Sequence, residues 1–135
     1  MTYCRNLNNE FCSYLPPTLL QLDIASCFQI SDEGKNTPEI PLFYLLLALI
    51  HLSARCPSLV WLNLTYLSIT DEGLSSLLEK LKKIQHLKVN HCPIGLNSLR
   101  PVALTLKSLE IVGCNISQSE VESILKVFQR VLIFW

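Results

Sequence analysis

The sequence has no excess of either charge, because eleven Lys and Arg residues balance eleven Asp and Glu residues. Domains that bind nucleic acid or anionic lipid usually carry a basic stripe. A glycine-rich phosphate loop, a run of like charges and a low-complexity tract are also missing. The sequence therefore predicts no nucleic-acid partner and gives no sign of a second domain.

Apolar runs long enough to cross a membrane are missing too. The run "IPLFYLLLALIHL" at residues 40–52 falls short of the about 20 residues that span a bilayer. We interpret it as a buried helix and expect no membrane partner. The start, "MTYCRNLNNEF", lacks the positive charge and apolar stretch of a secretory signal, which predicts a cytoplasmic or nuclear protein.

Two arrangements that often carry chemistry do not occur. The six cysteines include no Cys-x-x-Cys pair, the commonest spacing of a structural zinc or redox site. Serines are plentiful, but none lies between glycines in a sharp strand-to-helix turn. We therefore predict no catalytic residues, no metal and no cofactor, and we do not expect an enzyme.

The sequence does contain an internal repeat. "ISDEG" at residues 30–34 and "ITDEG" at residues 69–73 each follow a leucine-rich stretch. The pattern Leu, two variable positions, Leu, one variable position, aliphatic occurs four times. Its second leucine is Leu22, Leu62, Leu87 and Leu109, and the last three recur at intervals of 22 to 25 residues. The longer interval after Leu22 indicates an insertion, and Val131 is predicted to occupy the equivalent position in a fifth repeat.

Strand and helix periods alternate within each repeat. The leucine pattern has the period of a half-buried strand, and the segments between strands have helical spacing. Three apolar stripes predict helices: Leu42, Leu45, Leu46, Leu49; Leu74, Leu77, Leu78, Leu81; and Val121, Ile124, Leu125, Phe128. The stretch "SQSE" from Ser117 to Glu120 is a capping box, so the last helix is predicted to start near Gln118.

The repeated acidic motif has a structural interpretation. After each strand the chain must bury one aliphatic residue, Ile69 in the second copy, and begin a helix. We expect Asp71 to accept hydrogen bonds from the free N–H groups at that start, and Gly73 to relax the backbone there. Ile30, Asp32 and Gly34 are the counterparts in the first copy.

The segment "CPSLVWLNLTYLSITDEGLSSLLEKL" resembles the cysteine-containing class of leucine-rich repeats, best known from F-box/LRR proteins of the ribonuclease-inhibitor-like superfamily. Cys27, Cys92 and Cys114 match the mid-repeat cysteine of that class, and Leu67 departs from it. The resemblance implies an α/β leucine-rich repeat solenoid of about 4 to 5 repeats, with a curved parallel β-sheet on the concave side and helices on the convex side. It covers about residues 15–135, and Cys4, Leu7 and Phe11 suggest an N-terminal helix or partial repeat in residues 1–14.

The resemblance also implies a function. It favours a protein-protein interaction scaffold, namely the substrate-recognition module of an F-box/LRR-type ubiquitin-ligase adaptor. A relative lacking the F-box fits as well, because F-box helices are not visible in residues 1–14. The alternative is a structural or assembly protein that associates through its repeat ends and has no ubiquitin-ligase role.

A partner would bind the variable strand positions, which the resemblance places on the concave side. Tryptophan and tyrosine on an exposed sheet are the anchors that interfaces favour, whereas Lys88 and Glu110 are expected to form a cross-strand ion pair. Because His86 and His91 occupy different columns of the repeat, and Cys92 points into the core, we do not predict a metal site there. The predicted partner-binding residues are Trp61, Asn63, Tyr66, His86, Lys88, His91, Glu110 and Arg130.

The apolar end "RVLIFW" bears on assembly, because a bare terminal repeat exposes an apolar face and an unpaired strand edge. We expect either that the repeat domain is incomplete at its C-terminus or that the protein associates with itself, or is continued, through its C-terminal strand.

Overall fold

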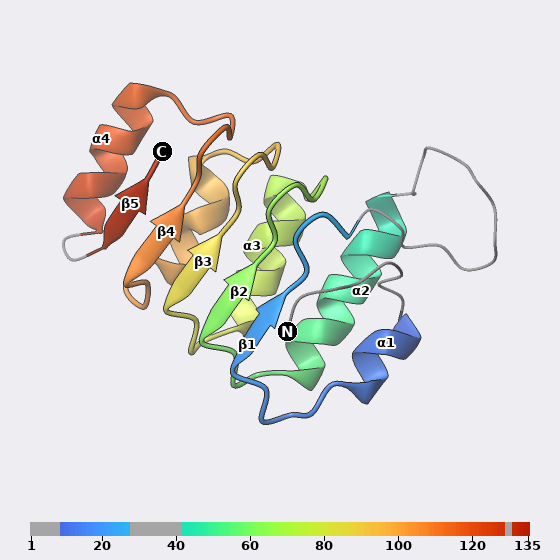
Figure 1. Cartoon of the computed structure of the whole chain (residues 1–135). Coiled ribbons are helices and arrows are strands. Elements are labelled where there is room, and N and C mark those ends of the chain that lie inside the picture. Colours follow the sequence, from blue (N-terminus) through green and yellow to red (C-terminus); the bar gives the residue numbers. More distant parts are fainter. Residues whose placement is uncertain (1–8, 28–41, 129–130) are drawn as a thin grey trace.

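A computed structural model describes residues 9–27, 42–128 and 131–135 of the chain (Figure 1). The described helices are α1 (Asn9–Tyr14), α2 (Leu42–Arg55), α3 (Asp71–Lys80) and α4 (Gln118–Val127), together with the 3₁₀ helix η1 (Leu96–Val102). The strands are β1 (Gln21–Asp23), β2 (Trp61–Asn63), β3 (His86–Lys88), β4 (Ser108–Glu110) and β5 (Leu132–Phe134).

The five strands form one parallel sheet in the order β1-β2-β3-β4-β5, and the helices lie on one side of it (Figure 1). Each strand therefore pairs with the strand of the next repeat. Parallel neighbours need a crossover connection, which a helix supplies between most of these strands. The predicted parallel sheet with helices is confirmed, and it fits an α/β repeat fold.

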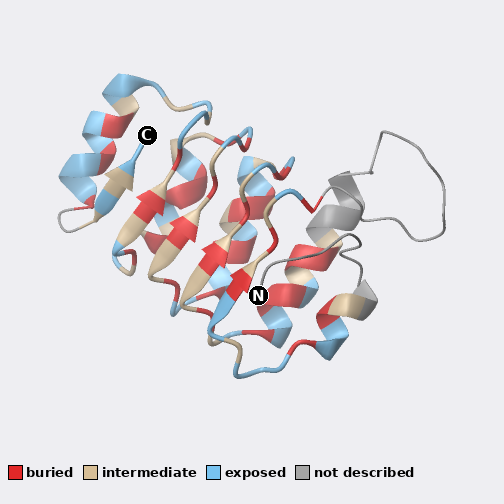
Figure 2. Cartoon of the chain, in the orientation of Figure 1, coloured by how far each residue is buried: buried red, intermediate tan, exposed pale blue. Residues whose placement is uncertain are grey.

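The core forms because the register is constant from repeat to repeat. Leu22 lies beside Leu62, Leu62 beside Leu87, and Leu87 beside Leu109, and all four are buried. A second buried row follows two residues later, made of Ile24, Leu64, Val89 and Ile111. Figure 2 shows buried residues in the middle of β1 to β4 and on the helices beside them. The predicted column of repeat leucines is confirmed.

The predicted register of the fifth strand is wrong. Ile133, and not Val131, lies beside Leu109, so Leu132 is placed opposite Ser108. Residues 131–135 are all apolar, so alternation gives no signal that distinguishes one register from another. Because the shift is two residues, Leu132 stays on its predicted face of the sheet and moves by one column. Arg130 lies outside the described residues.

The three predicted helices are present as α2, α3 and α4. The capping box of α4 is complete: the Ser117 hydroxyl accepts from the Glu120 N–H, and the Glu120 carboxylate accepts from the Ser117 N–H at 2.8 Å. The helix begins at Gln118, as predicted. The structure also contains the short helix α1, although Cys4 and Leu7 lie outside the described residues.

The third repeat contains η1 where its neighbours have α-helices, and the sequence did not predict this element. Pro101 lies inside η1 and has no N–H to continue an α-helical ladder. A groove of about 430 Å³ remains between η1 and α4.

The start of α3 differs from the prediction. Thr70 is the N-cap, and its hydroxyl accepts from the Gly73 N–H. Asp71 instead accepts from the N–H of Gly95 in the next repeat, at 2.6 Å. Gly73 is a buried residue within α3, and among the described glycines the positive φ belongs to Gly113. Ile69 is buried as predicted, whereas Ile30, Asp32 and Gly34 lie outside the described residues.

The apolar run at residues 40–52 falls largely in α2, a helix of 14 residues. Across the described part of the chain, no helix combines the length and apolar character that crossing a membrane requires.

The fold predicts a sharp contrast between two leucines. Leu62→Ala removes a side chain from the middle of the buried column, so we expect the free energy of unfolding to fall by about 2–5 kcal/mol. Leu104→Ala, at a residue that is 96% exposed, should change it by less than about 0.5 kcal/mol. Urea denaturation followed by circular dichroism measures both, and similar losses would contradict the proposed core.

Candidate functional site

The face of the sheet opposite the helices carries two columns of side chains. The sheet register aligns Trp61, His86 and Ser108 in one column, and Asn63, Lys88 and Glu110 in the other. All six are half-buried, and none of the described helices covers them (Figure 1). We call this surface, formed by the two columns on β2, β3 and β4, the open face.

Lys88 occupies the centre of the open face. Its Nζ atom lies 2.8 Å from Glu110 Oε1, which confirms the predicted cross-strand ion pair, and 6.0 Å from the centroid of the Trp61 ring. Asn90 donates from Nδ2 to the second carboxylate oxygen of Glu110 at 2.9 Å. The aromatic, cationic and anionic groups therefore hold one another in place across three adjacent repeats.

The surroundings of Glu110 change its titration. Partial burial raises its pKa, but hydrogen bonds from Lys88 and Asn90 and the charge of Lys88 lower it by more, so the net pKa lies below the ordinary value of 4.5. The carboxyl group is therefore ionised at neutral pH and remains paired with Lys88.

His86 lies next to this network on β3. Its Nδ1 atom shares a hydrogen bond with Ser108 Oγ at 2.7 Å, which fixes the orientation of the ring toward β4. Asn63 is turned toward its own backbone, because its Oδ1 atom accepts from the Thr65 N–H at 3.1 Å. Of the two columns, the one containing His86 carries the aromatic side chains of the open face.

A second cluster lies where the strands end. The backbone is left-handed at one equivalent position in each of the first four repeats, at Ser26, Tyr66, His91 and Gly113. The Tyr66 and His91 rings stack there, with centroids 4.6 Å apart and planes within 5° of parallel. Gly113 makes room for the stack, because a Cβ atom at that position would clash with the His91 ring.

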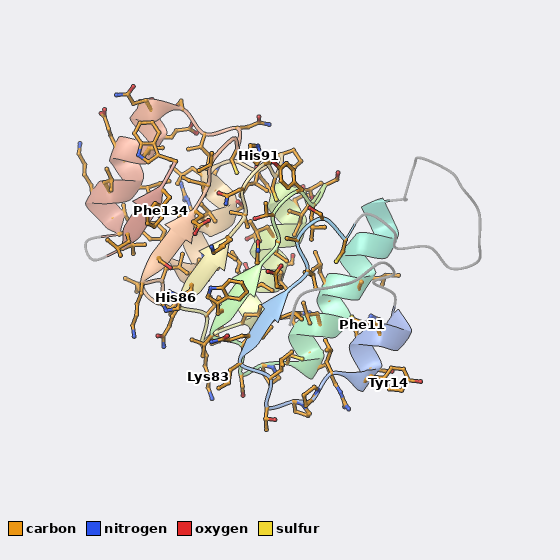
Figure 3. All side chains as sticks on the ribbon, viewed as in Figure 1. Phe11, Tyr14, Lys83, His86, His91 and Phe134 are labelled. Atoms are coloured by element: carbon orange, nitrogen blue, oxygen red, sulfur yellow. The ribbon has the colours of Figure 1, made fainter. Side chains whose placement is uncertain are left out.

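The predicted single patch is thus divided in two. Trp61, His86, Lys88 and Glu110 lie together on the strands, whereas Tyr66 and His91 lie beyond the carboxyl ends of the strands. Figure 3 shows the labelled His86 and His91 at opposite ends of β3. Ser108 and Asn90 were not predicted as site residues, although the alignment of repeats places Ser108 beside His86.

Two of the repeat cysteines, Cys92 and Cys114, form hydrogen bonds that link neighbouring repeats. Cys92 donates from Sγ to the Leu64 carbonyl at 3.2 Å, and Cys114 makes the equivalent bond to the Val89 carbonyl at 3.0 Å. Burial raises the pKa of the Cys92 thiol to about 11, and burial also raises that of Cys114. Neither thiol is therefore a ready nucleophile at neutral pH.

Metal ligands do not gather in the part of the chain that the structure describes, where no group of three His, Cys, Asp or Glu side chains could hold an ion.

The lowered pKa of Glu110 predicts a pH dependence. Its ionised form favours the fold, so its contribution is present above about pH 4.5 and is lost as the pH falls through the lower folded-state pKa. Because the pair is partly exposed, Glu110→Gln should lower the free energy of unfolding at pH 7 by only about 0.2–1 kcal/mol. The difference from the unmodified protein should shrink by pH 3 in urea titrations at both pH values.

Glu79→Gln on the exposed side of α3 controls for the substitution itself. A loss for Glu110→Gln that is the same at pH 3 and pH 7 would contradict the assigned role of the ion pair.

The stacked rings predict an energetic coupling between His91 and Gly113. Gly113→Ala combines a left-handed backbone, which costs roughly 1–2 kcal/mol for a residue with a Cβ atom, with a clash against the His91 ring. In a His91→Ala background only the backbone cost remains, so the loss from Gly113→Ala should be smaller. A double-mutant cycle by urea unfolding measures the difference. Equal losses in the two backgrounds would show that the ring does not press against Gly113.

Comparison with known proteins gives a family-level result. Residues 55–78 match the family described as leucine-rich repeat. The matched segment begins at the last residue of α2, contains all of β2 and ends within α3, so it covers one strand and most of the helix that follows it. A comparison with curated proteins found no match. The match, together with the constant register of the parallel sheet, supports a leucine-rich repeat protein.

Proposed function

We propose that the chain is a protein-protein interaction module that binds its partner on the open face. Leucine-rich repeat domains are commonly protein-interaction modules. The observation that carries the proposal is the position of Trp61, a half-buried aromatic residue on an uncovered sheet, with the Lys88 ammonium near its ring.

Side chains of the open face are already fixed by contacts with one another, and this favours binding. A partner that contacts a mobile surface must offset the entropy of fixing each side chain, about 0.5–1.5 kcal/mol for a long one. Here Glu110 already holds Lys88, and Ser108 holds His86. Trp61 supplies the large aromatic anchor around which interface energy usually concentrates.

The charges of this surface favour a protein over a nucleic acid. Lys88 is neutralised by Glu110 at 2.8 Å, so the open face offers no free basic stripe to phosphates. The chain as a whole carries a formal net charge of zero.

At a finer level, we propose that the repeats form a curved solenoid with the open face on the concave side. The likeness of the sequence motifs to F-box/LRR proteins supports a role as the substrate-recognition module of a ubiquitin-ligase adaptor, or of a relative lacking the F-box. We further propose that the module is not an enzyme. The buried Cys92 thiol and the half-buried Cys114 thiol, both hydrogen-bonded, support that view, since their raised pKa values disfavour the reactive thiolate.

Substitution at the open face tests the proposal. We expect Trp61→Ala to reduce the recovery of bound proteins at least about tenfold, because truncating a central aromatic anchor commonly costs 2 kcal/mol or more. Affinity capture with quantitative mass spectrometry measures that recovery against the unmodified chain.

Leu104→Ala is the matched control, since Leu104 is exposed and follows η1 in the helix layer. It should leave recovery unchanged. A captured set that is the same for Trp61→Ala as for the unmodified chain would exclude the open face as the binding surface.

A further inference from the structure

β5 differs from the other four strands in its exposure. Ile133 stands in the buried leucine column but is only half-buried, whereas the four leucines of that column are buried. Leu132, Phe134 and Trp135 are 68%, 55% and 58% exposed. Figure 2 shows the contrast, with β5 in the colours of intermediate and exposed residues beside the buried centres of β1 to β4. Both faces of this strand therefore present apolar surface to solvent.

The backbone of β5 also has an unused edge among the described residues. Leu132 donates its N–H to the Lys107 carbonyl at 2.9 Å, and the Phe134 carbonyl accepts from the Ile111 N–H at 2.8 Å. Successive residues of a strand direct their N–H and C=O groups to opposite sides. The N–H and C=O of Ile133 therefore point away from β4, on the side where the described sheet ends.

The opposite end of the sheet is not apolar in the same way. Leu22 of β1 is buried although β1 is also a terminal strand, and Cys12 and Leu15 belong to the same buried cluster. The outward positions of β1 are Gln21 and Asp23. Among the residues of these two terminal strands, the large exposed apolar side chains therefore lie on β5, although Leu20, just before β1, is 55% exposed.

We propose that β5 pairs with β5 of a second copy of this chain, antiparallel, about a two-fold axis at Ile133. A two-fold axis between identical edges makes the pair antiparallel. Its central residue can exchange both N–H···O bonds with its counterpart only if these groups point outward. Ile133 satisfies that condition and is the middle residue of β5.

This register matches apolar groups on both faces. On the open side of the sheet, Leu132 lies opposite Phe134 of the second copy, and the reverse pair repeats the contact. On the core side, Ile133 meets Ile133 of the second copy, so the half-buried position gains a neighbour. Cross-strand apolar pairs of this kind are favourable. A net charge of zero adds no overall repulsion between the two copies.

A head-to-tail arrangement fits less well. If β1 of another copy continued the parallel register beyond β5, Leu132 would face Gln21 and Phe134 would face Asp23. The carboxylate would then lie against an aromatic ring and lose water without gaining a partner. Such contacts would also form a ring or an open filament and not a two-fold dimer.

Two double variants of the full chain test the register. L132K/F134K places like charges opposite each other across the two-fold axis, whereas L132E/F134K places opposite charges there. The variants differ only at position 132, an exposed site whose neighbour on β4 is the uncharged Ser108. Circular dichroism and urea unfolding check that the two variants are equally folded.

Sedimentation equilibrium over a range of concentrations gives the dimer dissociation constants. We expect the unmodified chain to dimerise, and L132E/F134K to dimerise at least about tenfold more tightly than L132K/F134K. A monomeric unmodified chain at all concentrations would overturn the proposal. Equal association of the two variants would also overturn it, because in the head-to-tail arrangement position 132 faces the uncharged Gln21.

Discussion

The constant register of the parallel sheet is the constraint on which the rest of the structure depends. Each repeat buries its leucines only against the neighbouring repeats, so stability requires that equivalent residues lie side by side. The backbone ladder enforces this alignment beyond the short strands. Leu64 and Val89 donate to the Lys88 and Glu110 carbonyls, and the bonds continue as far as the left-handed residues Ser26, Tyr66 and His91.

The same register generates the side-chain contacts of the surface. Because equivalent positions are adjacent, Lys88 can pair with Glu110 and Tyr66 can stack on His91. The internal bonds of Cys92 and Cys114 likewise reach one repeat back, and Asp71 reaches one repeat forward to Gly95. These groups join repeats that would otherwise be held mainly by aliphatic packing. A small surface can therefore be rigid although each strand has only three residues.

The sequence predicted the fold well where the pattern of apolar residues was unambiguous. The leucine column, the helix starting at Gln118 and the Lys88–Glu110 pair all follow from spacing. Prediction failed where the spacing of apolar residues did not distinguish one strand register or helix type from another, and where contacts between repeats determine the structure. The wholly apolar segment at residues 131–135 could not fix its own register, and the helical period is broken around Pro101. Thr70 and not Asp71 caps α3, and Asp71 instead contacts Gly95 in the next repeat, a contact that no local pattern reveals.

In the candidate site, too, the sequence predicted some contacts and missed others. Column alignment brought Trp61, His86 and Lys88 together correctly, but it did not show that Tyr66 and His91 turn away at the strand ends. That separation arises from the left-handed backbone at both residues, and non-glycine residues seldom adopt this conformation. A tyrosine and a histidine at these positions gave no sequence signal for the left-handed backbone, which glycine adopts more readily, as Gly113 does at the equivalent position of the next repeat.

Amide hydrogen exchange tests the shared register most directly. If the ladder extends across the repeats as described, the amides of Leu64, Tyr66, Val89 and His91 should be strongly protected, including those of the two exposed aromatic residues. If the Tyr66 and His91 amides exchanged as fast as unstructured peptide while Leu64 and Val89 stayed protected, the repeats would not be joined beyond their strands. Fast exchange at all four positions would contradict the stacked sheet itself.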